Sequence, residues 1–133
     1  VIGVVLCVSK KYRRGGMQML SAELLSFIVG NLIIKNMVDR LRPCQIDETV
    51  SLIVKIPFDS SFPSGHTLNG ITAAVTLMFI DKRMGIPAIA LAVLIAFSRM
   101  YNFMHFPTDV LAGAVLGVVS AVFVNFLFKR AGN

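Results

Sequence analysis

The stretch that decides the fold is residues 105–130, HFPTDVLAGAVLGVVSAVFVNFLFKR. It contains an apolar block over 108–128, which approaches the ~20 apolar residues that a helix needs to cross the hydrocarbon core of a bilayer. Pro107 suits the first position of such a helix, and Lys129 and Arg130 follow its last apolar residue. These features predict a transmembrane helix that begins near Pro107 and ends in a basic pair.

Three further apolar blocks precede this one, over residues 17–34, 67–80 and 84–97. The first approaches spanning length, and the other two reach it when their polar ends are counted. The chain of 133 residues is 56% hydrophobic and only 15% charged, whereas a soluble domain is about a quarter charged. We therefore expect a single domain over residues 1–133 that forms an all-α, polytopic transmembrane helix bundle.

The first nine residues form a separate, shorter apolar stretch. At about 1.5 Å per residue, Val1 to Ser9 could cross only half of the hydrocarbon core as a helix. There is no Met at position 1, and no basic segment precedes the stretch as it would in a signal peptide. We expect the chain to open partway through a helix, with the N-terminal helix or helices of the bundle missing or truncated.

Basic residues distinguish the two sides of the predicted bundle. If each block crosses once, eight of the 13 Lys and Arg residues fall on one side: Lys10, Lys11, Arg13, Arg14, Lys82, Arg83, Lys129 and Arg130. The other side holds the remaining five: Lys35, Arg40, Arg42, Lys55 and Arg99. By the positive-inside rule, the side with eight is cytoplasmic. Membrane topology thus accounts for the net charge of +6, and we expect no nucleic-acid partner.

The connection over residues 44–62 is the one long link between blocks. We expect it to pack as an ordinary loop on the helix ends, although an interfacial segment that dips into lipid is the alternative. Cys7 and Cys44 fall on opposite sides of the predicted bundle, which excludes a disulfide between them.

Three short motifs lie at the outward ends of the apolar blocks. They are K-x6-RP at residues 35–43, PSGH at 63–66 and SR-x5-H-x3-D at 98–109. Together they supply three cations, a glycine turn that can open a helix, two histidines and a carboxylate. A phosphate-transfer site needs this inventory.

The first motif is weak evidence when it stands alone. Lys35 and Arg42 lie about two helical turns apart, and they would share one face if the helix continued until Pro43 ends it. However, Lys and Arg at the ends of transmembrane helices are common without a catalytic role.

The second motif immediately precedes an apolar helix. Ser64 is a suitable N-cap, and Gly65 lets a ligand approach the backbone. The unpaired amides of a first helical turn bind phosphate readily, and His66 would lie beside such an anion. The alternative on this segment alone is a capped helix with an exposed histidine.

The third motif surrounds the turn before the last helix. Asp109 can accept a hydrogen bond from one ring nitrogen of His105, which would fix the tautomer and leave a lone pair on the other nitrogen. The alternative is that Asp109 only caps the helix. Small residues recur every four positions after it, at Gly113, Gly117 and Ala121. We favour packing within the chain over dimerisation for this stripe, which would turn Asp109 toward the bundle interior.

Taken jointly, the three motifs resemble the signature of the type 2 phosphatidic acid phosphatase (PAP2) superfamily. The sequence matches all three parts in order and without a substitution, and residues 101–113, YNFMHFPTDVLAG, are similar to the bacterial membrane-bound branch. The resemblance covers residues 17–128. Membrane members usually carry six spans, so the chain departs from the family pattern at its front.

The resemblance implies a role for each motif residue. His105 would attack phosphorus and form a phosphohistidine, Asp109 would orient it, and His66 would protonate the leaving oxygen and then activate water. The phosphate oxygens would be held by three cations and a helix start: Lys35, Arg42, Arg99, Ser64 and Gly65. No His, Cys, Asp or Glu cluster has the spacing of a metal site, so we expect no metal and no other cofactor.

The sequence therefore predicts an integral membrane phosphatase of lipid phosphates or diphosphates, in the bacterial plasma membrane with its site facing outward. The resemblance to bacterial relatives and the outward site imply undecaprenyl diphosphate as the first expected substrate, and phosphatidylglycerophosphate and phosphatidic acid are the alternatives. From another class, the chain could be a non-catalytic membrane fragment that binds anionic lipid through the same cations. The expected partners are the lipid phosphate and membrane lipids, and a homo-oligomer is left open.

Overall fold

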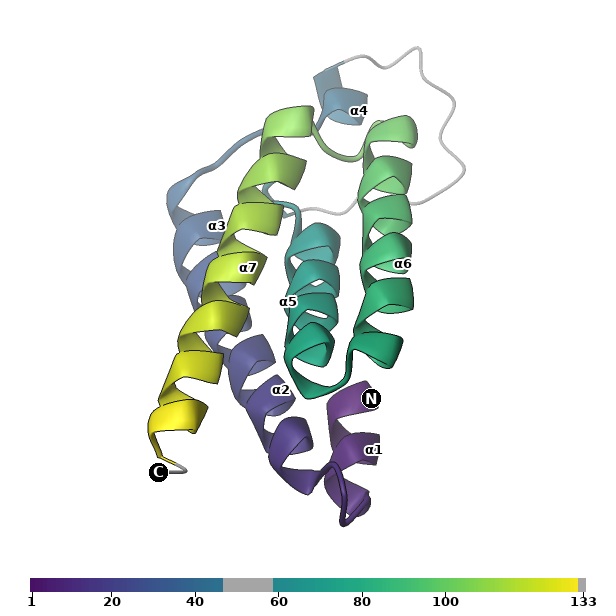
Figure 1. The fold of residues 1–133 in the computed structure, drawn as a ribbon. Helices are drawn as coiled ribbons and strands as arrows, with labels where there is room; N and C mark the ends of the chain where they lie inside the picture. Colours follow the sequence, from purple (N-terminus) through teal and green to yellow (C-terminus); the bar gives the residue numbers. More distant parts are fainter. Residues whose placement is uncertain (47–58, 132–133) are drawn as a thin grey trace.

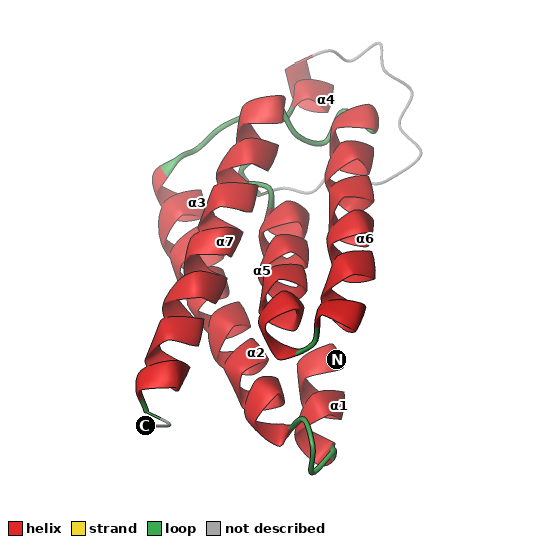
Figure 2. Ribbon diagram, viewed as in Figure 1, coloured by secondary structure: helices red, strands yellow, loops and turns green. Residues whose placement is uncertain are grey.

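The computed structural model describes residues 1–46 and 59–131, and every regular element in these ranges is a helix (Figure 2). Two short helices, α1 (Ile2–Val8) and α4 (Pro43–Ile46), accompany the long ones. The predicted 44–62 connection lies largely outside the described residues. The predicted all-α, polytopic bundle is confirmed.

The first long helix is continuous but changes its pitch. It consists of α2 (Arg13–Ser26), the π-helical turn η1 (Phe27–Ile34) and α3 (Lys35–Met37). Gly30 lies in the π-helical part, where a Cβ would overlap Leu68 Cδ2. The absence of a side chain at this position therefore lets Leu68 of the neighbouring helix pack against the backbone.

Three of the helices are long and apolar enough to cross a membrane. They are Arg13–Met37, α6 (Lys82–Tyr101) and α7 (Pro107–Arg130), and α5 (Gly65–Ile80) is a shorter apolar helix. The prediction that the last helix begins near Pro107 is confirmed, because Pro107 is its first residue. The bundle thus agrees with all four apolar blocks of the sequence.

The shortest of these four helices, α5, lies at the centre and packs against α2, α6 and α7 (Figure 1). Its buried positions include three threonines, Thr67, Thr72 and Thr76. The hydroxyl groups of Thr72 and Thr76 each donate to the carbonyl four residues earlier, at 2.8 Å. Because the helix satisfies these buried polar groups itself, α5 can lie inside an apolar bundle without water.

The small-residue stripe of α7 packs against α5, as predicted. A Cβ on Gly113 would lie 2.7 Å from the Ser64 carbonyl oxygen, and one on Gly117 would lie 2.8 Å from the Leu68 carbonyl oxygen. Asp109 and Ala121, on the same stripe, are fully buried. The preference for packing within the chain is confirmed, and the stripe does turn Asp109 into the bundle.

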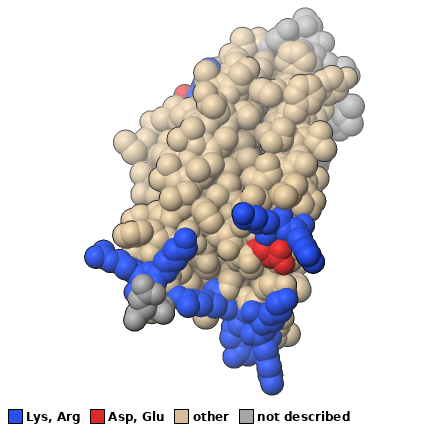
Figure 3. Space-filling view, in the orientation of Figure 1, with Lys and Arg blue, Asp and Glu red and all other residues tan. Residues whose placement is uncertain are grey.

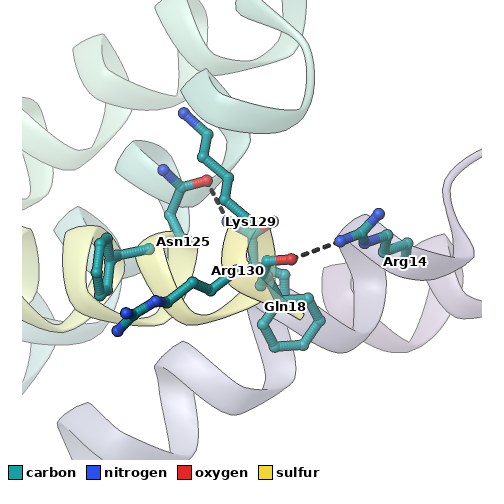
Figure 4. Close-up of a pocket in the computed structure, with 7 residues that line it drawn as sticks. Arg14, Gln18, Asn125, Lys129 and Arg130 are labelled. Atoms are coloured by element: carbon teal, nitrogen blue, oxygen red, sulfur yellow. Dashed lines mark hydrogen bonds between the residues drawn. The ribbon is translucent and has the colours of Figure 1, made fainter. Parts of the chain in front are cut away.

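The eight basic residues predicted to share one side gather at one end of the bundle (Figure 3). They lie at the α1–α2 turn, at the start of α6 and at the end of α7. At this end α2 and α7 are joined by polar contacts (Figure 4): Arg14 donates to the Phe128 carbonyl, and Gln18 Nε2 donates to Asn125 Oδ1 at 3.1 Å. Cys7 and Cys44 are both free thiols.

The close approach of α5 and α7 predicts the effect of adding one methyl group. Gly117→Ala should lower the thermal midpoint in detergent, because the new Cβ would lie 2.8 Å from a backbone oxygen of α5 and force the helices apart. Overpacking of this kind costs about 1–3 kcal/mol, against about 1 kcal/mol gained from the helix propensity of alanine.

Gly70→Ala is the matched control, because its Cβ would meet Ala92 Cβ at 3.6 Å, an ordinary contact. A midpoint for Gly117→Ala at or above that of Gly70→Ala would show that the two helices are not held at backbone contact.

Candidate active site

A cavity of about 550 Å³ lies at the end of the bundle where α5 and α7 begin and α6 ends. Its wall includes six of the eight predicted site residues: Lys35, Arg42, Gly65, His66, Arg99 and His105. Asp109 and Ser64 are fully buried behind this wall. Residues from all three motifs therefore line or adjoin one cavity, although they belong to different helices and to the links between them.

Lys35 and Arg42 reach the cavity by a different route from the one predicted. The first long helix ends at Met37, and Pro43 starts α4 instead of ending a helix. The expectation that both cations share a continuous helix face is therefore wrong. The link after Met37 bonds to residues 60 and 61, because Arg40 N donates to Ser60 Oγ at 3.2 Å and Ser61 N donates to the Arg40 carbonyl at 2.8 Å.

A carboxylate brings the two cations of the first motif together. Asp59 Oδ2 lies 2.5 Å from Lys35 Nζ, and Asp59 Oδ1 accepts a hydrogen bond from Arg42 Nη2 at 2.7 Å. Burial opposes ionisation of Asp59, but hydrogen bonds from Lys35 and Arg42 outweigh it and lower the pKa of the carboxyl group. The pair of cations is thus positioned by an ion-pair bridge.

Arg42 is the most strongly held of the cavity cations. Its Nη1 donates to the Met104 carbonyl at 3.0 Å, and its Nε donates to the Asp59 carbonyl at 3.3 Å. The same Nη1 lies 3.2 Å from His105 Nε2. A buried guanidinium with this many fixed contacts is a preorganised donor for an anion.

His105 is buried, and its two ring nitrogens have different surroundings. Nδ1 donates to the Ser61 carbonyl at 2.8 Å, which leaves the lone pair on Nε2, the nitrogen that faces Arg42. Burial lowers the pKa of His105 to about 4, and Arg42 acts in the same direction, while the Ser61 carbonyl and Asp109 oppose the shift. The ring is therefore neutral at physiological pH, with the lone pair of Nε2 on the side of Arg42.

Asp109 does not make the direct hydrogen bond to His105 that the sequence predicted. Its Oδ2 lies 3.9 Å from His105 Nδ1 and instead accepts from Ser61 Oγ at 2.5 Å and from Phe106 N at 2.9 Å. The carboxylate therefore caps the start of α7 and holds Ser61, whose carbonyl orients the imidazole. Asp109 acts on His105 through one intermediate residue.

Three residues of this network were not predicted as site residues: Arg40, Asp59 and Ser61. Arg40 Nη1 pairs with Asp109 Oδ1 at 2.7 Å and donates to Thr108 Oγ1 at 2.8 Å. Its guanidinium also lies over the Phe106 ring, 4.2 Å from the centroid. All three residues lie in non-helical links, where no periodic pattern marks a functional position.

The second motif opens α5, as predicted, but Ser64 has a different role. Ser64 occupies the N-cap position, yet its hydroxyl makes no bond to the helix amides and accepts from Thr67 Oγ1 at 3.0 Å. The predicted side-chain cap is therefore wrong. Gly65 and the exposed His66 form the part of the motif that lines the cavity.

Arg99, in the last turn of α6, completes the set of cavity cations. Its Nε is buried and has no hydrogen-bond partner among the residues that the structure describes. A buried donor without a partner is costly, so this atom points to an anion that enters the cavity. Over residues 1–46 and 59–131, no group of three or more His, Cys, Asp or Glu side chains could hold a metal ion.

Comparisons with known proteins agree with this geometry. The model of the PAP2 superfamily matches residues 15–132. The chain is 35% identical over 117 residues to an undecaprenyl-diphosphatase of Sulfolobus acidocaldarius, which covers 87% of this chain and 56% of that protein. It is 31% identical over 85 residues to undecaprenyl-diphosphatase BcrC of Bacillus subtilis, covering 64% of this chain and 42% of that protein. The chain spans about half the length of these curated relatives.

A solved structure extends the similarity to the fold. The crystal structure of a transmembrane PAP2-type phosphatidylglycerolphosphate phosphatase from Bacillus subtilis matches with a TM-score of 0.77 and 28% sequence identity. The match covers 97% of this chain and 66% of the solved one. The family model spans all three motifs and the cavity that they line, and the chain belongs to the PAP2 superfamily.

Proposed function

We propose that this chain carries the active site of an integral membrane phosphatase that acts on lipid phosphates or diphosphates, with undecaprenyl diphosphate as its substrate. The observation that carries this proposal is the pairing of a neutral, buried His105 with three cations around one cavity. A nucleophilic nitrogen beside donors for phosphoryl oxygens is the arrangement that phosphoryl transfer requires. The names of the two sequence relatives support the choice of substrate.

In the first half-reaction, His105 Nε2 attacks the terminal phosphorus of undecaprenyl diphosphate, and the bond from that phosphorus to the oxygen bridging the two phosphates breaks. Lys35, Arg42 and Arg99 hold the oxygens of the transferring group, where negative charge must be stabilised. His66 gives its proton to the departing oxygen. The products are undecaprenyl monophosphate, which keeps the bridging oxygen, and a phosphohistidine at residue 105.

In the second half-reaction, His66 accepts a proton from water as the oxygen of that water attacks the phosphohistidine. The bond from phosphorus to Nε2 breaks, and inorganic phosphate and the neutral ring of His105 are regenerated. His105 retains its Nδ1 proton throughout, because the Ser61 carbonyl accepts it at 2.8 Å. Asp109 and Arg40 stabilise Ser61 in the position that this requires.

A second substrate class is favoured by one comparison. The solved structure that resembles this chain is of a phosphatidylglycerolphosphate phosphatase, so phosphatidylglycerophosphate is the alternative head group, and phosphatidic acid carries the same terminal phosphate. The chemistry above applies equally to all three lipids, because each presents a terminal phosphoryl group.

The test of the proposed function is phosphate release in detergent from undecaprenyl diphosphate, phosphatidylglycerophosphate and phosphatidic acid. We expect the fastest release from undecaprenyl diphosphate, unchanged rates in EDTA, and inhibition by vanadate, whose five-coordinate form mimics the transition state. His105→Ala is the matched inactive control. Loss of activity on chelation, restored by Mg²⁺, would contradict the mechanism, and lipid binding without any release would favour a non-catalytic binding protein.

The protonation state of His105 can be measured directly, because the chain has only two histidines. In protein labelled with ¹⁵N-histidine, one ring should carry its proton on Nδ1 and titrate with a midpoint of about 4, well below the ordinary 6.5. The pKa of His105 is lowered because burial and the nearby positive charge of Arg42 both disfavour the charged ring. The ring therefore protonates only when the pH falls through this lowered pKa. His66→Asn assigns the signal. A midpoint near 6.5, or a proton on Nε2, would contradict a resting nucleophile at Nε2.

We also propose that the site lies on the outer face of the bacterial plasma membrane, because the opposite end of the bundle, which carries eight Lys and Arg residues, is expected in the cytoplasm. In a variant with both native cysteines replaced by alanine, a cysteine at the exposed position Asp39 should react with an impermeant maleimide in intact cells. A cysteine at the exposed position Lys82 should react only after the cells are permeabilised. The reverse pattern would place the site in the cytoplasm.

A further inference from the structure

One carboxylate in the cavity wall belongs to none of the three motifs. The two oxygens of Asp59 contact the two cations of the first motif, at 2.5 Å from Lys35 Nζ and 2.7 Å from Arg42 Nη2. These nitrogen atoms belong to two of the three cations that the proposed mechanism assigns to phosphoryl oxygens. A carboxylate and a phosphoryl group are both forked oxygen acceptors, so each can bridge this pair of donors.

The exposures of the three side chains distinguish the two largely buried cations from a carboxylate that faces solvent. The Lys35 and Arg42 side chains are 12% and 4% exposed, whereas the Asp59 side chain is 52% exposed. Buried cations require a nearby anion, because leaving them unpaired in a poorly solvated site is unfavourable. Asp59 therefore supplies the counter-charge of the free protein from the solvent side of the cavity.

The contacts of Arg42 would survive if the carboxylate moved away. Its Nη1 still donates to the Met104 carbonyl, and its Nε donates to the backbone carbonyl of Asp59, not to the side chain. Among the described residues, the Asp59 carboxylate has only Lys35 and Arg42 as hydrogen-bonding or ion-pair partners. Rotation of this side chain into solvent would thus free two positioned donors without disturbing the guanidinium.

The charge balance favours exchange of the carboxylate for phosphate. Lys35, Arg42 and Arg99 contribute three positive charges to the cavity wall and Asp59 one negative charge, which leaves a net charge of two positive. A phosphate dianion carries twice the charge of the carboxylate and has more oxygens to offer the same donors. The lowered pKa of Asp59 means that the carboxylate is ionised, and therefore competes, at physiological pH.

We propose that Asp59 is an internal competitor for the phosphate site, which pairs with Lys35 and Arg42 in the empty enzyme and is displaced by the phosphoryl group. The inference rests on the proposed phosphate site. Substrate and product phosphate must each displace the same carboxylate, so their affinities are lowered by the same factor. Such uniform weakening leaves the chemical step unchanged and speeds the release of inorganic phosphate.

The test is calorimetric titration of the purified protein in detergent with inorganic phosphate, in mildly alkaline buffer where phosphate is a dianion. Asp59→Asn keeps the size of the side chain and removes its charge. We expect the Kd for phosphate to fall about fivefold, which corresponds to about 1 kcal/mol, the upper end for an ion pair with an exposed partner. If Asp59 only held the two cations in position, Asp59→Asn would raise the Kd for phosphate, because a disordered pair of cations binds phosphate more weakly.

The matched control is Asp39→Asn, which removes one exposed negative charge at the same end of the bundle. An equal gain in affinity in both variants would assign the effect to overall charge and overturn the inference. The inference would also be overturned if Asp59→Asn kept a native thermal midpoint, which shows an intact fold, and its Kd for phosphate were unchanged or higher. If the wild type still released phosphate from lipid substrates, the proposed function would stand even though the inference about Asp59 had failed. No phosphate binding by any form would remove both proposals.

Discussion

The buried carboxylate of Asp109 is the interaction on which the site depends. It caps the start of α7 through Phe106 N, accepts from Ser61 Oγ, and pairs with Arg40. The backbone carbonyl of the same residue accepts from Ser64 N at 3.0 Å, at the entrance to α5. One residue thus ties together two helix starts and two non-helical links. Loss of the side chain would leave these donors unpaired, at about 1–3 kcal/mol for each buried one.

The glycines of α7 make this arrangement possible. Gly113 and Gly117 let the α7 backbone approach carbonyl oxygens of α5, and the same helix face carries Asp109 one turn earlier. Close packing in the apolar part of the bundle therefore determines where the polar end of α7 lies. His105, immediately before α7, is then held with Nδ1 on the Ser61 carbonyl and Nε2 toward Arg42. The packing of α7, the cap at its start and the orientation of His105 therefore all depend on a single helix interface.

The sequence predicted the helices and the residues that share the cavity, because both are marked by short segments of sequence: the helices by apolar blocks and the cavity residues by the three motifs. Apolar length predicted the blocks, Pro107 marked the first residue of α7, and four-residue spacing predicted the buried stripe. Two of the errors concern long-range hydrogen bonds. The first helix ends at Met37 because the following link bonds to residues 60 and 61, and Asp109 bonds Ser61 in place of His105. Asp59 and Ser61 leave no periodic signal, since their partners lie far away in the chain.

Formation of a phosphohistidine at residue 105 is the central step of the proposed mechanism. The direct measurement is mass spectrometry of rapidly quenched His66→Ala protein, mixed in EDTA with a lipid diphosphate, whose leaving group departs readily. Without His66 to activate water, hydrolysis of the intermediate is slow, so a base-stable, acid-labile phosphoryl group should accumulate on residue 105. Phosphate release from this variant with no modified His105 at any time, or a phosphoryl group on another residue, would contradict the account.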